Sequence, residues 1–159
     1  MIHACRFQAG KLFYINRYTK TPQFEQENKL GRQYEIRLGE LNCFSGLLKS
    51  ALLDTMKLTG FLPPDIKYQK FTANTAITHH SKKTYALCEP DLPFTVQIET
   101  LDKQADFDIT SVGFDDFDGQ LKHNASAHSK VNRKTGELFV FGADQMRPIC
   151  SYTLFNKDR

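Results

Sequence analysis

The chain has 159 residues, of which 40% are hydrophobic and 25% charged, and its formal net charge is +3. This length suits a single domain with a modest core, and the hydrophobic content excludes wholesale disorder. The small net charge, with no lysine or arginine run longer than two, argues against a nucleic-acid partner.

The first predicted element is a β-hairpin at the start of the chain. Residues 2–7 and 12–18 are rich in β-branched and aromatic side chains and flank the glycine-containing turn QAGK. The pattern predicts two antiparallel strands.

A helical insertion is predicted next, at about 41–62. Hydrophobic residues recur there at helical spacing, and Gly60 followed by two prolines ends the pattern. An ordinary helix packed on a sheet is one interpretation. Because Leu53, Leu58 and Phe61 add hydrophobic area beyond a single stripe, a membrane-surface patch is the other.

Two further strand units follow, and they resemble each other. Tyr85 falls on Leu138 at an offset of 53, and Phe94 falls on Cys150 at an offset of 56. A strand meander that recurs about every fifty residues is typical of propeller blades, although sandwiches and barrels also contain similar hairpins. Strands are expected at 74–80, 84–89 and 94–99, and again at 127–131, 137–142 and 150–155.

The cysteines and the N-terminus suggest a cellular compartment. The cysteines are widely separated, with no C-x-x-C pair, which argues against a zinc knuckle and suits reduced thiols. No leader pattern opens the sequence, and no apolar run approaches the roughly 20 residues that cross a bilayer. We therefore expect a cytoplasmic protein. The cysteines are Cys5, Cys43, Cys88 and Cys150.

Four stretches carry more specific motifs. They are MIHACRFQAGKLFYINRYTKT, FTANTAITHHSKKTYALCEPDLPF, VGFDDFDGQL and SAHSKVNRKTGELFVFG. Each resembles a motif of the carotenoid cleavage oxygenase family, which includes the retinoid isomerohydrolases, and the four occur in the family's order. The chain is thus identified as a member of this family, with residues 1–159 as the N-terminal part of a single propeller domain.

The resemblance implies an all-β fold, with about three blades of a seven-bladed β-propeller and one helical insertion. It also implies an Fe(2+) cofactor held on the propeller axis by four histidines. The implied activity is oxidative cleavage of a carotenoid or apocarotenoid double bond by O2, although one branch isomerises retinyl esters. Because three blades leave open sheet edges, we expect the chain to be part of a larger protein.

His128 takes the position of the first iron-ligating histidine of the family. Spacing alone favours a structural or surface role, because His128 stands by itself at a predicted strand start. Imidazole is a suitable ligand for Fe(II), and strands of different blades each contribute one such ligand. The other histidines match no ligand position, and they are His3, His79, His80 and His123. His3 is expected in a strand near the axis, and His79 and His80 are expected in solvent beside a turn.

Glu89 matches the glutamate that holds a ligand imidazole by its other N–H group. The alternative is a strand-end carboxylate that faces water. The chain departs from the family pattern nearby, with Cys88 in place of tryptophan and Pro90-Asp91 in place of two glycines. The direction in which the Glu89 carboxylate points is therefore left open by the resemblance. Ser129 replaces the usual proline after the ligand, which is expected to loosen the entry to the strand.

Cys43 is a candidate for lipidation, because NCFSGLL resembles a stretch of the isomerohydrolase branch that contains a lipid-modified cysteine. An unmodified, partly buried thiol is the alternative. The segment around it falls where the family has a membrane-apposed region, so peripheral membrane contact is a further expectation.

With one ligand of four, the chain alone is expected to be inactive. The alternatives to an enzyme are a non-catalytic propeller fragment and a lipid-binding or interaction scaffold.

Overall fold

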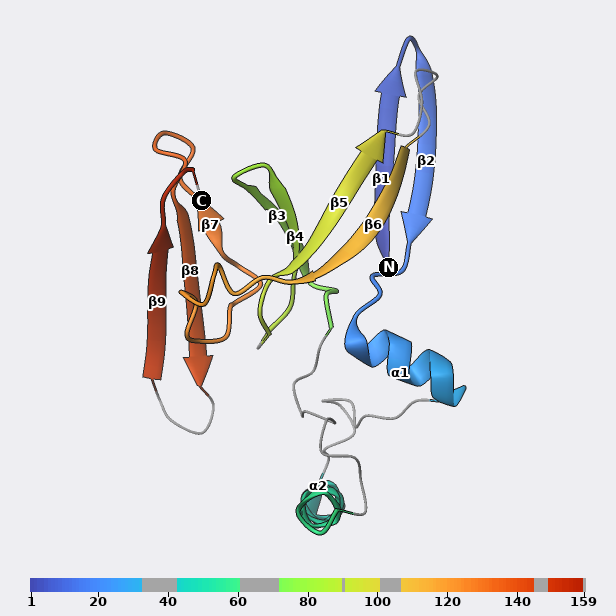
Figure 1. Cartoon of the computed structure of the whole chain (residues 1–159), viewed down its shortest axis with the longest axis vertical. Helices are drawn as coiled ribbons and strands as arrows, with labels where there is room; N and C mark the ends of the chain where they lie inside the picture. The colour runs from blue at the N-terminus through green and yellow to red at the C-terminus, as the bar shows by residue number, and fades with distance from the viewer. Residues whose placement is uncertain (33–42, 61–71, 90, 101–106, 145–148, 159) are drawn as a thin grey trace. The chain divides into compact units, whose positions relative to one another are not determined.

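The computed structural model describes residues 1–32, 43–60, 72–89, 91–100, 107–144 and 149–158. Within these ranges the chain forms three antiparallel sheets and two helices, an all-β partial propeller with a helical insertion (Figure 1). The elements are β1 (Ile2–Gln8), β2 (Lys11–Arg17), α1 (Pro22–Leu30), α2 (Cys43–Leu58), β3 (Ala76–His80), β4 (Lys83–Leu87), β5 (Phe94–Thr100), β6 (Phe107–Phe114), β7 (Lys130–Val131), β8 (Leu138–Asp144) and β9 (Ile149–Phe155).

Tight turns set the register of the first two sheets. Ala9 and Gly10 join β1 to β2 with φ of 49° and 75°, and Ser81 and Lys82 join β3 to β4 with φ of 46° and 63°. Positive φ at both central residues is typical of the type I′ turn, whose twist matches that of paired strands. The continuous β1–β2 ladder confirms the first predicted hairpin.

A strand that the sequence pattern does not predict completes the second sheet. Its order is β3-β4-β5-β6, and β6 pairs along all of β5, with a register shift between Thr95 and Val96. Ser111 and Gly113 interrupt the hydrophobic alternation of β6 and hide it in the sequence. The strand also connects to the first sheet, because Arg17 Nε lies 2.7 Å from Asp108 Oδ1.

The third sheet, β7-β8-β9, begins later than predicted. The strand expected at 127–131 is reduced to Lys130–Val131, and His128 lies in a turn before it. Ser126 and Ser129 use their hydroxyl groups on neighbouring backbone atoms, which offers this segment a turn in place of a strand ladder.

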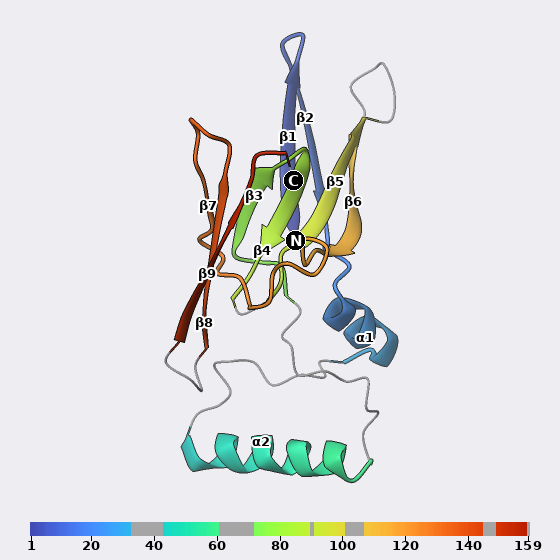
Figure 2. The ribbon, with the colours of Figure 1, turned by 60° about the vertical axis from the view of Figure 1, so that its left-hand side comes forward.

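Two hydrophobic clusters join the sheets. The first cluster lies between the first and second sheets, where Ile2, Ala4 and Ile15 pack against a group of buried residues. In agreement, β2 and β6 lie side by side in both views (Figure 1, Figure 2). The buried group is Ala73, Ala86, Phe94, Val96 and Ile109.

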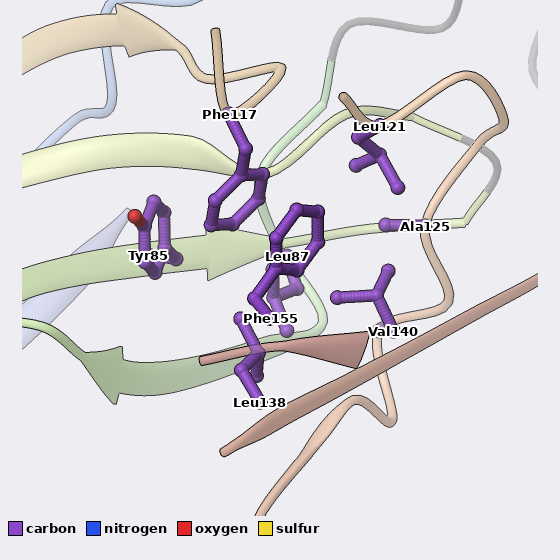
Figure 3. Packing of buried hydrophobic residues seen from close by; sticks show 9 residues of the cluster. Tyr85, Leu87, Phe117, Leu121, Ala125, Leu138, Val140 and Phe155 are labelled. Carbon is purple, nitrogen blue, oxygen red and sulfur yellow. The ribbon is translucent and has the colours of Figure 1, made fainter. Parts of the chain in front are cut away.

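The second cluster lies between the second and third sheets and includes the Phe117 ring (Figure 3). The Phe117 ring is stacked on Phe155 with centroids 4.0 Å apart, and it lies 5.5 Å from the Tyr85 ring. Phe117 has a φ of 55°, a conformation that a bulky residue adopts only when its surroundings hold it there. The buried residues of the second cluster are Tyr85, Leu87, Phe117, Leu121, Ala125, Ala127, Leu138, Val140 and Phe155.

The second cluster also corrects the alignment of the two repeated units. Tyr85 and Leu138, matched at an offset of 53, are buried in the same cluster and so lie on facing sides of two sheets. Equivalent residues of neighbouring blades point the same way around a propeller axis. The alignment is therefore wrong by an odd number of residues, since a slip of one reverses every side chain of a strand.

The chain divides into two compact units, residues 1–25 with 70–159 and residues 26–69.

Helix α1 begins at Pro22 and was not expected from the hydrophobic pattern. Thr21 caps it, because the Thr21 hydroxyl accepts the Phe24 N–H and the Thr21 carbonyl accepts the Glu25 N–H.

Helix α2 falls within the stretch expected to be helical. It is followed by Gly60, whose φ of 75° suits a helix end. Phe44, Leu48 and Leu52 recur every four residues, and all three side chains are exposed, Phe44 at 80%. Among the helices that the structure describes, none is long and apolar enough to span a membrane.

Candidate functional site

The site is assembled by a turn that follows β4. The Asp91 N–H donates to the Cys88 carbonyl at 3.0 Å, which closes the turn and places Glu89 at its tip. Asp91 is 2% exposed, and its carboxylate accepts the Thr72 N–H at 3.1 Å. Its carbonyl accepts the Ala125 N–H at 2.9 Å. Asp91 thus connects this turn to the segment that carries His128.

That segment crosses β8 at close range. The Ser126 N–H donates to the Phe141 carbonyl at 2.6 Å, and the Asn124 side-chain amide donates to the Ala143 carbonyl at 3.0 Å. Between these two bonds lies Gly142, where a Cβ atom would stand 1.9 Å from the Asn124 carbonyl oxygen. Only glycine allows the two backbones to approach this closely.

The Glu89 carboxylate binds the turn that contains His128. Glu89 Oε1 accepts the Ala127 N–H at 3.0 Å and the Ser126 hydroxyl at 3.3 Å. His128 Nε2 lies 3.7 Å from the same oxygen, beyond hydrogen-bond distance but within reach of an ion pair when the imidazole is charged. The Glu89 and His128 side chains are 47% and 68% exposed. The structure therefore brings these two residues together at the surface of the chain.

The other histidines lie elsewhere. His3 Nδ1 contacts the Tyr14 hydroxyl, His79 Nδ1 contacts Thr84, and His123 Nε2 lies 2.8 Å from the Thr153 hydroxyl. Among the described residues, no three histidine, cysteine, aspartate or glutamate side chains gather as a metal site. Three exposed imidazoles of the described residues, those of His3, His79 and His128, thus lie in different parts of the fold, and imidazole is a suitable ligand for Fe(II).

His80 is not in solvent, and this expectation was wrong. Only 3% of the residue is exposed, because the β3–β4 turn lies against the backbone of Gly136 and Asn156. Neither ring nitrogen makes a well-aligned hydrogen bond within the part of the chain that the structure describes. Burial lowers the pKa of His80, since it disfavours the charged imidazolium.

A cluster of three polar side chains, Lys83, Tyr85 and Asp115, stabilises the loop after β6. Lys83 Nζ donates to Asp115 Oδ2 at 2.7 Å, and the buried Tyr85 hydroxyl donates to the same oxygen at 3.2 Å. Burial raises the pKa of Tyr85, and the neighbouring Asp115 charge raises it further. Burial also opposes ionisation of Asp115, but the hydrogen bonds from Lys83 and the Phe117 N–H outweigh it and lower the Asp115 pKa. This group stabilises the Phe117 turn rather than the His128 turn.

Two residues of the site were missed by sequence reasoning. Ser126 directly precedes the Ala-His pair, so the motif itself contained the signal. Asp91 stands in the sequence only as a departure from the family's glycines, and no sequence pattern indicates that its carboxylate is buried.

Cys43 begins α2, but its side chain lies outside the described residues. Its lipidation stays a prediction.

Comparison with known proteins agrees with the fold and with the motifs. The family model described as retinal pigment epithelial membrane protein matches residues 1–159. A carotenoid 9,10(9',10')-cleavage dioxygenase 1 of Pisum sativum is 35% identical over 159 residues, and that of Arabidopsis thaliana is 36% identical. Each alignment covers 99% of this chain and 28% of the relative, so the chain spans under a third of their length.

A solved structure shows the same fold. The crystal structure of Pseudomonas brassicacearum lignostilbene dioxygenase matches with a TM-score of 0.68 and 23% sequence identity. The match covers 98% of this chain and 28% of that one.

Proposed function

Because this chain belongs to the family of the retinal pigment epithelial membrane protein and the carotenoid cleavage oxygenases, we propose that it contributes one part of an iron-dependent dioxygenase. The proposed reaction is oxidative cleavage of a carotenoid or apocarotenoid double bond by O2. Dioxygenases among its relatives support the reaction class, and the two named as carotenoid-cleaving support the substrate class.

The observation that supports the proposal most strongly is the arrangement around His128. The family motif assigns the first iron ligand to this position, and the side chain is exposed beside a carboxylate. We assign His128 one ligand position for Fe(2+), and we assign Glu89 the role of orienting it through the turn. The bound metal would supply the O2 chemistry. The role of this chain in the proposed enzyme is to hold one imidazole in a fixed direction.

The second candidate is a non-catalytic propeller fragment or a lipid-binding or interaction scaffold. It is favoured by the exposed hydrophobic side chains of Phe44, Leu48 and Leu52 on α2, which provide area for a lipid or a protein partner. Both candidates predict that residues 1–159 alone do not cleave an apocarotenal. They differ in what His128 does when the rest of a propeller is supplied.

We further propose a cytoplasmic protein that contacts membranes peripherally through α2. The exposed hydrophobic side chains of Phe44, Leu48, Leu52 and Leu58 support this contact, because hydrophobic area on a helix surface favours the membrane interface. Such a contact would suit a hydrophobic polyene substrate.

A chimaera tests the proposal. Residues 1–159 replace the matching segment of the Pisum sativum dioxygenase, and the purified protein is assayed for iron content and for cleavage of an apocarotenal. His128→Ala is expected to abolish both iron and product. His79→Ala, which removes an exposed imidazole bonded to Thr84, is the control and is expected to retain both. Full iron content in the His128→Ala chimaera would favour the scaffold.

A further inference from the structure

The Ser126 hydroxyl joins the Glu89 carboxylate to the backbone of His128. Ser126 Oγ donates to Glu89 Oε1 at 3.3 Å and accepts the His128 N–H at 3.1 Å. Ser126 is 7% exposed, and its own N–H anchors it to the Phe141 carbonyl of β8. The hydroxyl is therefore held between a carboxylate from one sheet and a turn attached to the next.

We propose that Ser126 is a positioning residue for His128. By bridging Glu89 to the His128 amide, its hydroxyl fixes the turn and so sets the direction in which the imidazole is presented. The use of this imidazole direction in metal binding rests on the proposed function. The coupling of Ser126 to the His128 turn is independent of the proposed function.

The contacts of the imidazole explain why the turn needs this bridge. The His128 side chain is 68% exposed, and its Nε2 lies 3.7 Å from Glu89 Oε1, outside hydrogen-bond distance. The contacts that hold His128 thus act on its backbone, which sets the direction of the Cα–Cβ bond that carries the ring. Glu89 Oε1 holds the Ala127 N–H directly and the His128 N–H through Ser126. Removal of the hydroxyl releases the second of these connections.

The chain offers a matched control in the same turn. Ser129 is also buried, at 9% exposure, and its hydroxyl donates to the Ser126 carbonyl instead of to Glu89. Ser126→Ala and Ser129→Ala remove the same atom from neighbouring positions. Ser126→Thr keeps a hydroxyl and tests whether the bridge, rather than the serine itself, is required.

The experiment measures amide hydrogen exchange and the backbone order parameter of His128 by NMR in residues 1–159. Ser126→Ala is expected to exchange the His128 amide about tenfold faster and to lower its backbone order parameter, because one restraining hydrogen bond to the backbone is lost. Ser126→Thr and Ser129→Ala are expected to stay within about threefold of the parent. Equal effects of both alanine variants, or no effect of Ser126→Ala, would overturn the positioning role. Thermal unfolding of each variant separates local release from loss of the fold.

A metal arm separates this inference from the proposed function. Co²⁺ alone is added as a paramagnetic probe to the chimaera described above, and selective broadening of the His128 imidazole signals is expected in the parent chimaera and reduced in its Ser126→Ala variant. Absence of broadening at His128 in the parent would refute its role as a ligand and leave the exchange result standing. Equal broadening in parent and Ser126→Ala would refute a role of Ser126 in metal presentation.

Discussion

Gly142→Ala should dislodge the segment that carries His128. The added Cβ would lie 1.9 Å from the Asn124 carbonyl oxygen, and 2.5 Å and 2.9 Å from two further Asn124 atoms. Ordinary contact begins at 3.4 Å, so the Asn124 backbone would have to move by about 1.5 Å. Both nearby hydrogen bonds, from Ser126 to Phe141 and from Asn124 to Ala143, would then break or lengthen.

The expected cost follows from these contacts. Each lost hydrogen bond costs about 1 kcal/mol, and forcing a methyl group into a packed site costs about 1–3 kcal/mol. The free energy of unfolding should therefore fall by about 3–5 kcal/mol. For a chain of this size, 1 kcal/mol corresponds to about 2–4 °C in Tm, so we expect a decrease of about 6–20 °C.

Thermal unfolding followed by far-ultraviolet circular dichroism measures this change. Ala143→Ser is the control, because it adds one heavy atom at the neighbouring residue, which is exposed, and is expected to shift Tm by less than about 2 °C. A Gly142→Ala protein that unfolds within about 2 °C of the parent would refute the close approach of the two backbones.

Three further perturbations test the rest of the fold. Phe117→Ala should lower the free energy of unfolding by about 3–5 kcal/mol in urea titration, because a buried stacked ring leaves a cavity; Phe117→Leu should cost less. Since burial lowers the folded-state pKa of His80, its contribution to stability is present above the unfolded value near pH 6.5 and is lost on acidification, so His80→Phe should flatten urea stability between about pH 7 and 5. The lowered pKa of Asp115 gives stability that is present above about pH 4 and lost as pH falls through the folded-state value, and Lys83→Met should reduce that loss. A pH profile unchanged by either substitution would contradict the corresponding assignment.

Local sequence signals predicted those elements whose register depends on near neighbours. The β1–β2 hairpin and the β3–β4 pair have alternating side chains around short turns, so residues close in sequence determine them. Strand β6 was hidden by Ser111 and Gly113, which do not fit a hydrophobic alternation. Helix α1 is mostly polar, and its signal was the Thr21-Pro22 start rather than a hydrophobic stripe.

The missed parts of the site depend on contacts distant in sequence. His80 is buried by residues more than fifty positions away. The turn next to it in the sequence therefore led to the wrong expectation of a solvent-exposed imidazole. Ser126 and Glu89 are 37 residues apart, and no periodicity predicts their bond. The family motif predicted that Glu89 and His128 belong together, but it did not predict that Glu89 bonds the turn more closely than the ring.

The outer faces of the first and third sheets have a consequence for synthesis. Phe7 is 80% exposed on the hairpin, and Tyr152 and Leu154 on β9 are 58% and 44% exposed. Exposed hydrophobic side chains of this kind can associate with other molecules during synthesis, which favours aggregation. Co-translational folding of this segment should therefore depend on chaperones, and expression yield should respond to their abundance.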